Sequence, residues 1–307
     1  MHDHIITTDS LTPSADLVAD LNRFLSAEIA NALGLQPEGH LHRLFDPLFR
    51  LPAGRFARLL ATADAGVARD GFSAGAGWLA QQLALPALVR GQENVPKEGP
   101  LLVMSNHPGA YDSLVLIQAL RRDDLLVVIS PIRALMRLPH SAAHFVQVRR
   151  GQGHATTRLN QARDHLLAGG AVLIFPTGVV DPDPDVMPGA AEALGGWSSS
   201  IGLLLNAAPE TQALPAIISR VLSPGWMRFP LVRLQPDGPH RRRLAEVLQL
   251  SQLVLMGRQR PQAPRLSFAP PMRLTALGAD LAPALVRDRL VTCACELLAA
   301  HAPAFAG

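Results

Sequence analysis

The chain of 307 residues contains few cysteines and few aromatic side chains. Its two cysteines, Cys293 and Cys295, lie close together in an apolar helical pattern near the end of the chain. Two such thiols cannot build a disulfide framework or complete a zinc site, so we expect them to be structural. With 5% aromatic residues and one tyrosine, a surface that stacks nucleic-acid bases is not expected either.

Long apolar runs are also missing. The most apolar stretch, from Ala76 to Val89, is interrupted by Gln81, Gln82 and Pro86, which makes it too short and too broken to span a bilayer. The residues that follow Met1 are polar and do not resemble a signal peptide. We therefore expect neither a transmembrane helix nor a cleaved leader.

Lysine is almost absent, since Lys97 is the only one among 28 basic residues. The many arginines reflect either a GC-rich genome or the binding of phosphates in CoA and anionic lipids, and both explanations stay open. The net charge is only +3, and 48% of the residues are hydrophobic, with a mean hydropathy of +0.18. This composition predicts one main domain with a large core.

The most informative motif runs from Asn106 to Asp112, between a short apolar strand and a mostly apolar helix. On a continuous helix, residues five apart would point about 140° away from each other. Pro108 and Gly109 break that path, so the carboxylate of Asp112 can accept a hydrogen bond from one imidazole nitrogen of His107. The other nitrogen is then a general base. The alternative is a surface histidine beside an N-cap aspartate.

Further motifs stand on both sides of this pair. Upstream is Gly91 to Pro96, and downstream follow Phe145 to Arg150, Phe175 to Gly178, and Leu214 to Ile218. In this order they resemble the glycerolipid acyltransferase family, which includes lysophospholipid and 1-acylglycerol-3-phosphate acyltransferases. The first signature of that family is a histidine, four residues and an aspartate. The resemblance covers about half of the chain, from roughly residue 88 to residue 222.

The resemblance implies a one-step transfer of a fatty acyl group from acyl-CoA or acyl carrier protein to a hydroxyl of a lysolipid or glycerolipid, with His107 as the base and Asp112 as its orienting partner. No metal and no cofactor besides the acyl co-substrate is implied. Nucleic acid is not an expected partner, whereas a membrane surface is, and we expect a cytoplasmic protein bound peripherally to the inner face of the membrane. The motifs also imply substrate-binding residues, namely Arg149, Arg150, Pro176, Thr177 and Gly178. The Gly178 N–H either stabilises the oxyanion or belongs to a simple turn.

The third motif departs from the family. Thr177 and Val180 stand where the family usually carries a glutamate and an arginine that help to hold the phosphate of the acceptor. Arg150 is the closest match to the arginine of the second motif. The acceptor therefore stays open between a lysophosphatidic acid, a lyso-aminolipid, another lysolipid and a non-phosphorylated alcohol. A rival function is a non-catalytic lipid- or acyl-carrier-binding protein on the same fold.

Two motifs imitate other sites. The acids Asp181, Asp183, Asp185 and Glu192 have calcium-loop spacing, but Val186 replaces the required glycine, so we expect a stiff acidic loop that gates the acceptor or repels anionic head groups. The run from Gly71 to Gly75 matches the nucleophile elbow of serine hydrolases. It follows a helical pattern instead of a strand, and Gly71 is expected to end that helix.

The predicted fold is α/β, a mixed and mostly parallel sheet with crossover helices and an N-terminal helical extension. The extension covers residues 1–85, with one helix from Ser14 to Gly34 and a second that opens at Pro52, and it either covers the sheet or faces a bilayer. The acyltransferase domain covers residues 86–307, with a C-terminal cap at 223–307. Strands are expected near Leu101, Leu125, Phe145, Ala171, Ala213 and Arg265, and helices near Ser113, Ala155 and Trp197, followed by two C-terminal helices.

Overall fold

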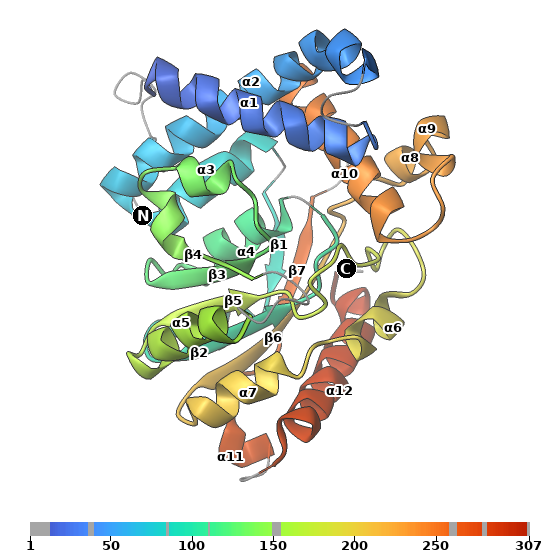
Figure 1. Ribbon diagram of the computed structural model, residues 1–307. Coiled ribbons are helices and arrows are strands. Elements are labelled where there is room, and N and C mark those ends of the chain that lie inside the picture. Colours follow the sequence, from blue (N-terminus) through green and yellow to red (C-terminus); the bar gives the residue numbers. More distant parts are fainter. Residues whose placement is uncertain are drawn as a thin grey trace.

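The computed structural model describes residues 13–35, 40–83, 86–109, 111–148, 155–257, 263–277 and 281–305. These residues form an eight-stranded sheet with helices on both faces (Figure 1). The strands follow the order β1-β7-β6-β2-β5-β3-β4, and β8 pairs with β6. Their bounds are β1 Leu88–Arg90, β2 Leu101–Ser105, β3 Leu125–Ile129, β4 Phe145–Gln147, β5 Ala171–Ile174, β6 Gln212–Ser219, β7 Arg265–Phe268 and β8 Met272–Arg273.

The sheet is mixed and mostly parallel, as the sequence predicts. Strands β2 to β6 run parallel to one another, whereas β7 and β8 pair with β6 in the antiparallel sense. The central strand β2 is buried on both faces, and its side chains alternate between two cores. Leu101 and Val103 belong to one core and Leu102 and Met104 to the other.

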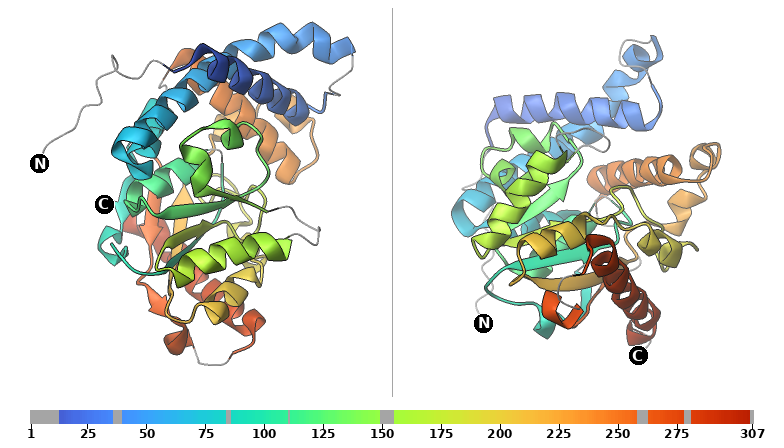
Figure 2. Two further views of the ribbon diagram at one scale, coloured as in Figure 1. Left: turned by 60° about the vertical axis from the view of Figure 1, so that its left-hand side comes forward. Right: turned by 60° about the horizontal axis from the view of Figure 1, so that its bottom comes forward.

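Two helical layers enclose the sheet, and Figure 2 shows both from further sides. The first core packs against α2 (His40–Asp70), α3 (Phe72–Leu83), α4 (Asp112–Leu120) and part of α10 (Pro239–Met256), with α1 (Ala15–Ala32) lying across α2. The second core packs against α5 (Ala155–Leu167), α7 (Ser200–Ala207) and α12 (Pro283–His301). Shorter helices are α6 (Ala190–Gly195), α8 (Pro224–Met227), α9 (Pro230–Arg233) and α11 (Leu274–Leu277).

The N-terminal helical region forms as predicted, with one correction. Ser14 caps α1, its side chain accepting from the Leu17 N–H at 3.2 Å. The second helix does not open at Pro52, because α2 begins at His40 and continues through Pro47 and Pro52. Its packing against α1 and α3 outweighs the backbone hydrogen bonds that two prolines remove. Gly71 ends α2 with φ 94°, so no strand precedes the imitation nucleophile elbow.

The C-terminal region is more than a cap, because β7 lies inside the sheet between β1 and β6. The sequence did not predict β1, a three-residue strand parallel to β7. Just after β1, Gly91 has φ 70°, and a Cβ there would lie 2.3 Å from the Phe268 carbonyl oxygen. The turn at Gly91 therefore holds β1 against β7 through close backbone contact.

The topology brings three loops to one edge of the sheet. Strands β6, β2 and β5 are neighbours and parallel, so their carboxyl ends meet at that edge. His107 follows β2, Phe175 follows β5 and Arg220 follows β6. Such an edge is where open α/β sheets bind their ligands.

Candidate active site

A turn held at both ends positions His107. The side-chain amide of Asn106 donates to the Ile218 carbonyl and accepts from the Ile218 N–H, both at 2.9 Å, and so continues the pairing of β2 with β6. Next to it, Gly109 packs so closely that a Cβ would lie 2.9 Å from Val221. The Tyr111 hydroxyl donates to the Val221 carbonyl at 2.7 Å. The loops after β2 and β6 thus hold each other in place.

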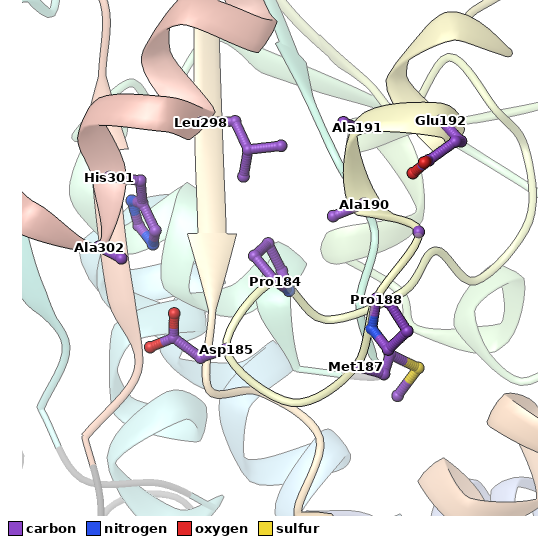
Figure 3. A pocket seen from close by; sticks show the side chains of 11 residues that line it. Pro184, Asp185, Met187, Pro188, Ala190, Ala191, Glu192, Leu298, His301 and Ala302 are labelled. Carbon is purple, nitrogen blue, oxygen red and sulfur yellow. The ribbon is translucent and has the colours of Figure 1, made fainter.

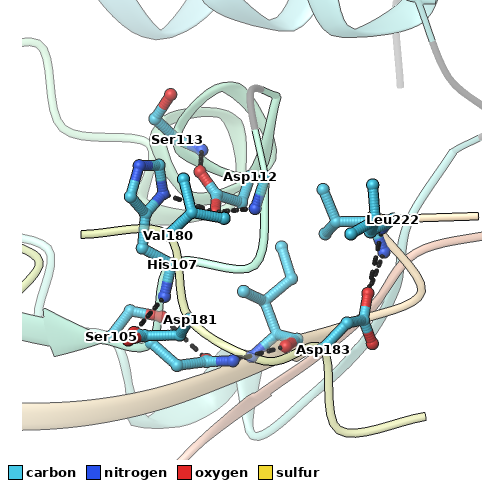
Figure 4. A network of polar contacts seen from close by, with 12 residues as sticks. Ser105, His107, Asp112, Ser113, Val180, Asp181, Asp183 and Leu222 are labelled. Atoms are coloured by element: carbon cyan, nitrogen blue, oxygen red, sulfur yellow. Dashed lines mark hydrogen bonds and ion pairs between the residues drawn. The ribbon is translucent and has the colours of Figure 1, made fainter. Parts of the chain in front are cut away.

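His107 and Asp112 form the predicted hydrogen-bonded pair (Figure 4). The Nδ1 atom of His107 lies 2.8 Å from the Asp112 carboxylate, which also accepts from the backbone N–H groups of Gly109 and Ser113. The Asp112 side chain is fully buried, whereas that of His107 is 27% exposed. A buried orienting carboxylate differs from a surface N-cap aspartate, and it leaves the Nε2 atom of His107 for proton transfer.

Acidic groups dominate the electrostatics around His107. Burial is the largest single influence and lowers the pKa of His107, but the charge and hydrogen bond of Asp112, with smaller contributions from Glu246 and Asp181, raise it to about 9. Burial raises the pKa of Glu246 to about 7, against the opposing effect of His107. The imidazole of His107 is therefore protonated near neutral pH, and the negative charges of the nearby carboxylates stabilise this imidazolium.

Asp181 supports the histidine from the loop after β5. Its carboxylate accepts from the His107 N–H at 2.9 Å, and its own N–H donates to the His107 carbonyl at 2.7 Å. The Thr177 hydroxyl donates to the same carboxylate at 3.2 Å and is buried. Thr177 thus holds the carboxylate that positions His107, and its predicted contact with the acceptor stays a prediction.

The two other predicted residues of the third motif also have structural contacts. The Gly178 N–H donates to the Phe175 carbonyl at 3.0 Å in a turn with φ 63°, so it is not available for an oxyanion in this conformation. Pro176 is buried, and its carbonyl accepts from the Ser198 N–H at 3.1 Å. Since a glycine after a strand commonly makes such a turn, the oxyanion role expected of Gly178 does not fit this geometry.

Phe175 belongs to the third motif, but no function was predicted for it from the sequence. Its ring stacks on the imidazole of His107, with centroids 4.5 Å apart and planes 28° from parallel. The stacking covers one face of the imidazole and restricts its rotation. Phe175 lies directly after β5, at the same sheet edge as His107. This position in the sequence could have indicated that its side chain lies near the histidine.

The acidic loop points its carboxylates inward. Asp183 accepts from four backbone N–H groups, those of Asp185, Arg220, Val221 and Leu222, at 2.8–3.2 Å, and burial raises its pKa to about 6. Asp185 pairs with Arg220 and Arg265. Within the described residues, no group of three metal-binding side chains occurs. Together with Asp181, these two aspartates brace the loop, and the expected repulsion of head groups does not follow from them.

One face of α10 lies over the site and was not predicted. Arg242 donates from Nε to the Val180 carbonyl at 2.8 Å, and Gln249 bonds to Val221 and Ser223 in the loop after β6. Glu246 lies one turn from each of them, so it shares the face that meets the loops around His107. Arg242 belongs to a visible basic run, 241–243, but nothing local shows which arginine faces the site.

The structure describes some of the arginines near the motifs but not the two that were predicted to bind substrate. Arg149 and Arg150 lie outside the described residues. Arg122, another arginine near the motifs, is buried and bonds to Asp124 and to the carbonyls of Pro96, Gly99 and Gly169. It therefore joins loops instead of presenting a charge to phosphate.

A pocket of about 290 Å³ lies between the acidic loop and the end of α12 (Figure 3). Asp185, Glu192, Leu298 and His301 are among its lining residues, and His107 is not. Both ring nitrogens of His301 are engaged, by Ser219 at 2.9 Å and by Ser267 at 2.8 Å. With Asp185 also paired, the buried polar groups of this pocket already have partners within the protein.

Comparison with known proteins identifies a family that is similar to part of the chain. Residues 87–194 match the family model described as Acyltransferase. This segment is therefore similar to the acyltransferase family. The match confirms the prediction of an acyltransferase, and it contains His107, Asp112 and Thr177 but ends before the predicted fourth motif at Leu214.

Among solved structures, this acyltransferase is similar to the 1-acyl-sn-glycerophosphate acyltransferase PlsC from Thermotoga maritima. The two chains share 16% identity over 91% of this chain and 96% of that chain, with a TM-score of 0.45. No curated protein matches the chain significantly. In the described part of the acyltransferase, no helix combines the length and apolar character needed to cross a membrane.

Proposed function

We propose that this acyltransferase moves a fatty acyl group from acyl-CoA or acyl carrier protein to a hydroxyl of a lysolipid or glycerolipid. The observation that carries the proposal is the 2.8 Å hydrogen bond between His107 Nδ1 and the buried Asp112 carboxylate, at a ligand-binding edge of the sheet. No cofactor is needed, because a thioester is already activated. Peripheral binding to the cytoplasmic face of a membrane would bring the enzyme to its acceptor.

In the proposed reaction, His107 Nε2 takes the proton of the acceptor hydroxyl while the hydroxyl oxygen attacks the thioester carbonyl. The C–S bond then breaks, and the departing thiolate receives that proton from the imidazolium. Because Asp112 and its neighbours raise the pKa of His107 to about 9, the imidazolium is a stable intermediate carrier of the proton. The reaction requires the neutral imidazole at its start, so its rate rises with pH towards that value.

Arg242 is the described cation best placed to bind a phosphate on the acceptor. Its Nε bonds to the carbonyl of Val180, the residue next to Asp181. Within the described residues, no hydrogen bond or ion pair engages its two terminal nitrogens. A guanidinium anchored at Nε can present those nitrogens to a phosphate, which favours a phosphorylated lysolipid over an uncharged alcohol.

The test is release of free thiol from palmitoyl-CoA and palmitoyl acyl carrier protein with a panel of lysolipids. We expect acceptor-dependent release by the wild type and a loss of about 10²–10⁴-fold in His107→Ala. His240→Ala, which removes an exposed histidine at the start of α10, is the matched control and should retain full activity. A folded wild-type protein that binds lipid but releases no thiol with any pair would instead be a binding protein.

A further inference from the structure

Helices α8 and α9 form a short protrusion beyond one end of α10, visible at the edge of the molecule in Figures 1 and 2. We call residues 224–234 the α8–α9 protrusion. Three of its apolar side chains face solvent, with exposed fractions of 42% for Phe229, 41% for Leu231 and 80% for Leu234. Leu231 and Leu234 are three residues apart, so a helical turn places them on one side.

The protrusion is firmly mounted despite its exposed outer side. On its inner side Val232 is fully buried, in a small core with Leu222 and Leu244. The Trp226 indole donates to Gln252 of α10 at 2.8 Å, and the Ser223 N–H donates to Gln249 at 2.6 Å. The exposed apolar side chains are therefore carried on a fixed support, as expected for a docking surface and not for a frayed loop.

Cations flank the apolar side chains. Arg228 and Arg233 are both exposed, and in the described part of the chain neither has a carboxylate partner. Phenylalanine and leucine beside unpaired arginines suit the boundary between the head groups and the acyl chains of an anionic bilayer. A protein partner would need a shaped, largely buried hydrophobic centre, which three side chains on a narrow protrusion do not offer.

The α8–α9 protrusion is connected to the loop that contacts the turn of His107. Helix α8 begins just after Leu222, whose N–H is held by Asp183, and Val221 contacts the turn that carries His107. We propose that the α8–α9 protrusion inserts Phe229, Leu231 and Leu234 into the surface of an anionic membrane, beside the site where the acceptor reacts. The proposed role of this insertion in delivering the acceptor rests on the proposed function, whereas membrane binding itself can be measured without turnover.

The first test is co-sedimentation of the full chain with phosphatidylcholine vesicles, with and without phosphatidylglycerol. We expect binding that depends on phosphatidylglycerol, and a loss of about tenfold or more in the triple variant Phe229→Ser, Leu231→Ser, Leu234→Ser. Arg228→Gln with Arg233→Gln should remove the preference for phosphatidylglycerol. The control is Leu203→Ser with Leu285→Ser, which changes leucines that are 52% and 51% exposed on α7 and α12.

A second test locates the contact directly. The emission of Phe229→Trp should shift to the blue when anionic vesicles are added, whereas that of Leu203→Trp should not. The proposal is overturned if the wild type binds no vesicles, if the triple variant binds as well as the wild type, or if Leu48→Ser with Leu51→Ser on α2 abolishes binding instead. Because no substrate is present, these outcomes are independent of whether His107 catalyses acyl transfer.

Discussion

His107 and Asp181 bind each other twice: the N–H of each donates to an oxygen of the other, at 2.9 Å to the Asp181 carboxylate and at 2.7 Å to the His107 carbonyl. They are 74 residues apart in the sequence and lie in the loops that follow the neighbouring strands β2 and β5. His107 is thus positioned by two independent contacts, since Asp112 fixes its ring and Asp181 fixes its backbone.

Asp181→Ala should therefore lower kcat by about 10- to 100-fold, because the turn that carries His107 loses its second anchor. Asp181→Asn keeps an oxygen that accepts from the His107 N–H and should recover most of the activity. Steady-state kinetics and circular dichroism of both variants check this. Equal losses in the two variants would show that the charge of Asp181 matters and its hydrogen bond does not.

Asp112→Asn should lower kcat by about a hundredfold with little change in the KM for the acyl donor. The amide cannot hold the imidazole in the same tautomer, and loss of the negative charge lowers the pKa of His107. Nuclear magnetic resonance titration of the His107 ring gives a readout that a purely structural defect would not produce. An unchanged pKa in the variant contradicts the electrostatic role given to this carboxylate.

Glu246→Gln should move the rising limb of the pH profile of kcat/KM to lower pH. The wild-type limb reports the deprotonation of His107, whose pKa is about 9. The pKa of Glu246 is about 7, so this residue is anionic through that limb and favours the imidazolium. Removing its charge makes the neutral base available at lower pH. Glu192→Gln, an exposed acid on α6, is the control and should leave the limb in place.

Arg242→Gln should raise the KM for a phosphorylated lysolipid by about tenfold while leaving that for the acyl donor unchanged. The adjacent variant Arg243→Gln is the control, because Arg243 is exposed and pairs with Glu28 of α1. An uncharged acceptor should not distinguish Arg242→Gln from the wild type. If it does, Arg242 supports the loop and does not bind the head group.

Much of the framework could be predicted from local sequence. Buried strands such as Leu101–Ser105 are continuous apolar runs in the sequence, and the strand predicted near Arg265 forms as Arg265–Phe268. The break at Pro108 and Gly109 correctly indicated that His107 and Asp112 could meet. These features depend on residues close in sequence, whose conformational preferences are visible without knowledge of the fold.

The rest depends on contacts between distant segments. Glu246 and Arg242 lie over the site because α10 packs there. The spacing of residues within the motifs gives no information about this packing. The same holds for the hydrogen bond between the Thr177 hydroxyl and Asp181, which the motif did not predict. The helix start predicted at Pro52 was wrong for the same kind of reason. Proline is a local signal for the first turn of a helix, but the packing of α2 keeps the helix continuous through this position.

The last prediction concerns stability and rests on Asp183. Its two carboxylate oxygens accept from four backbone N–H groups, and one of these belongs to Arg220, which is held at φ 59°. In Asp183→Asn, one oxygen is replaced by an amide that cannot accept, so about two buried N–H groups lose their partner. We expect the free energy of unfolding to fall by about 2–4 kcal/mol.

Urea unfolding monitored by circular dichroism measures this loss. Asp237→Asn, which changes a carboxylate that is 83% exposed, is the control and should stay close to the wild type. The variant should also bind vesicles less well, because Asp183 holds Leu222 directly before the α8–α9 protrusion. A variant as stable as the wild type would mean that the loop after β6 keeps its conformation through Asn106, Tyr111 and Gln249 alone, and that the inward-facing carboxylate is dispensable.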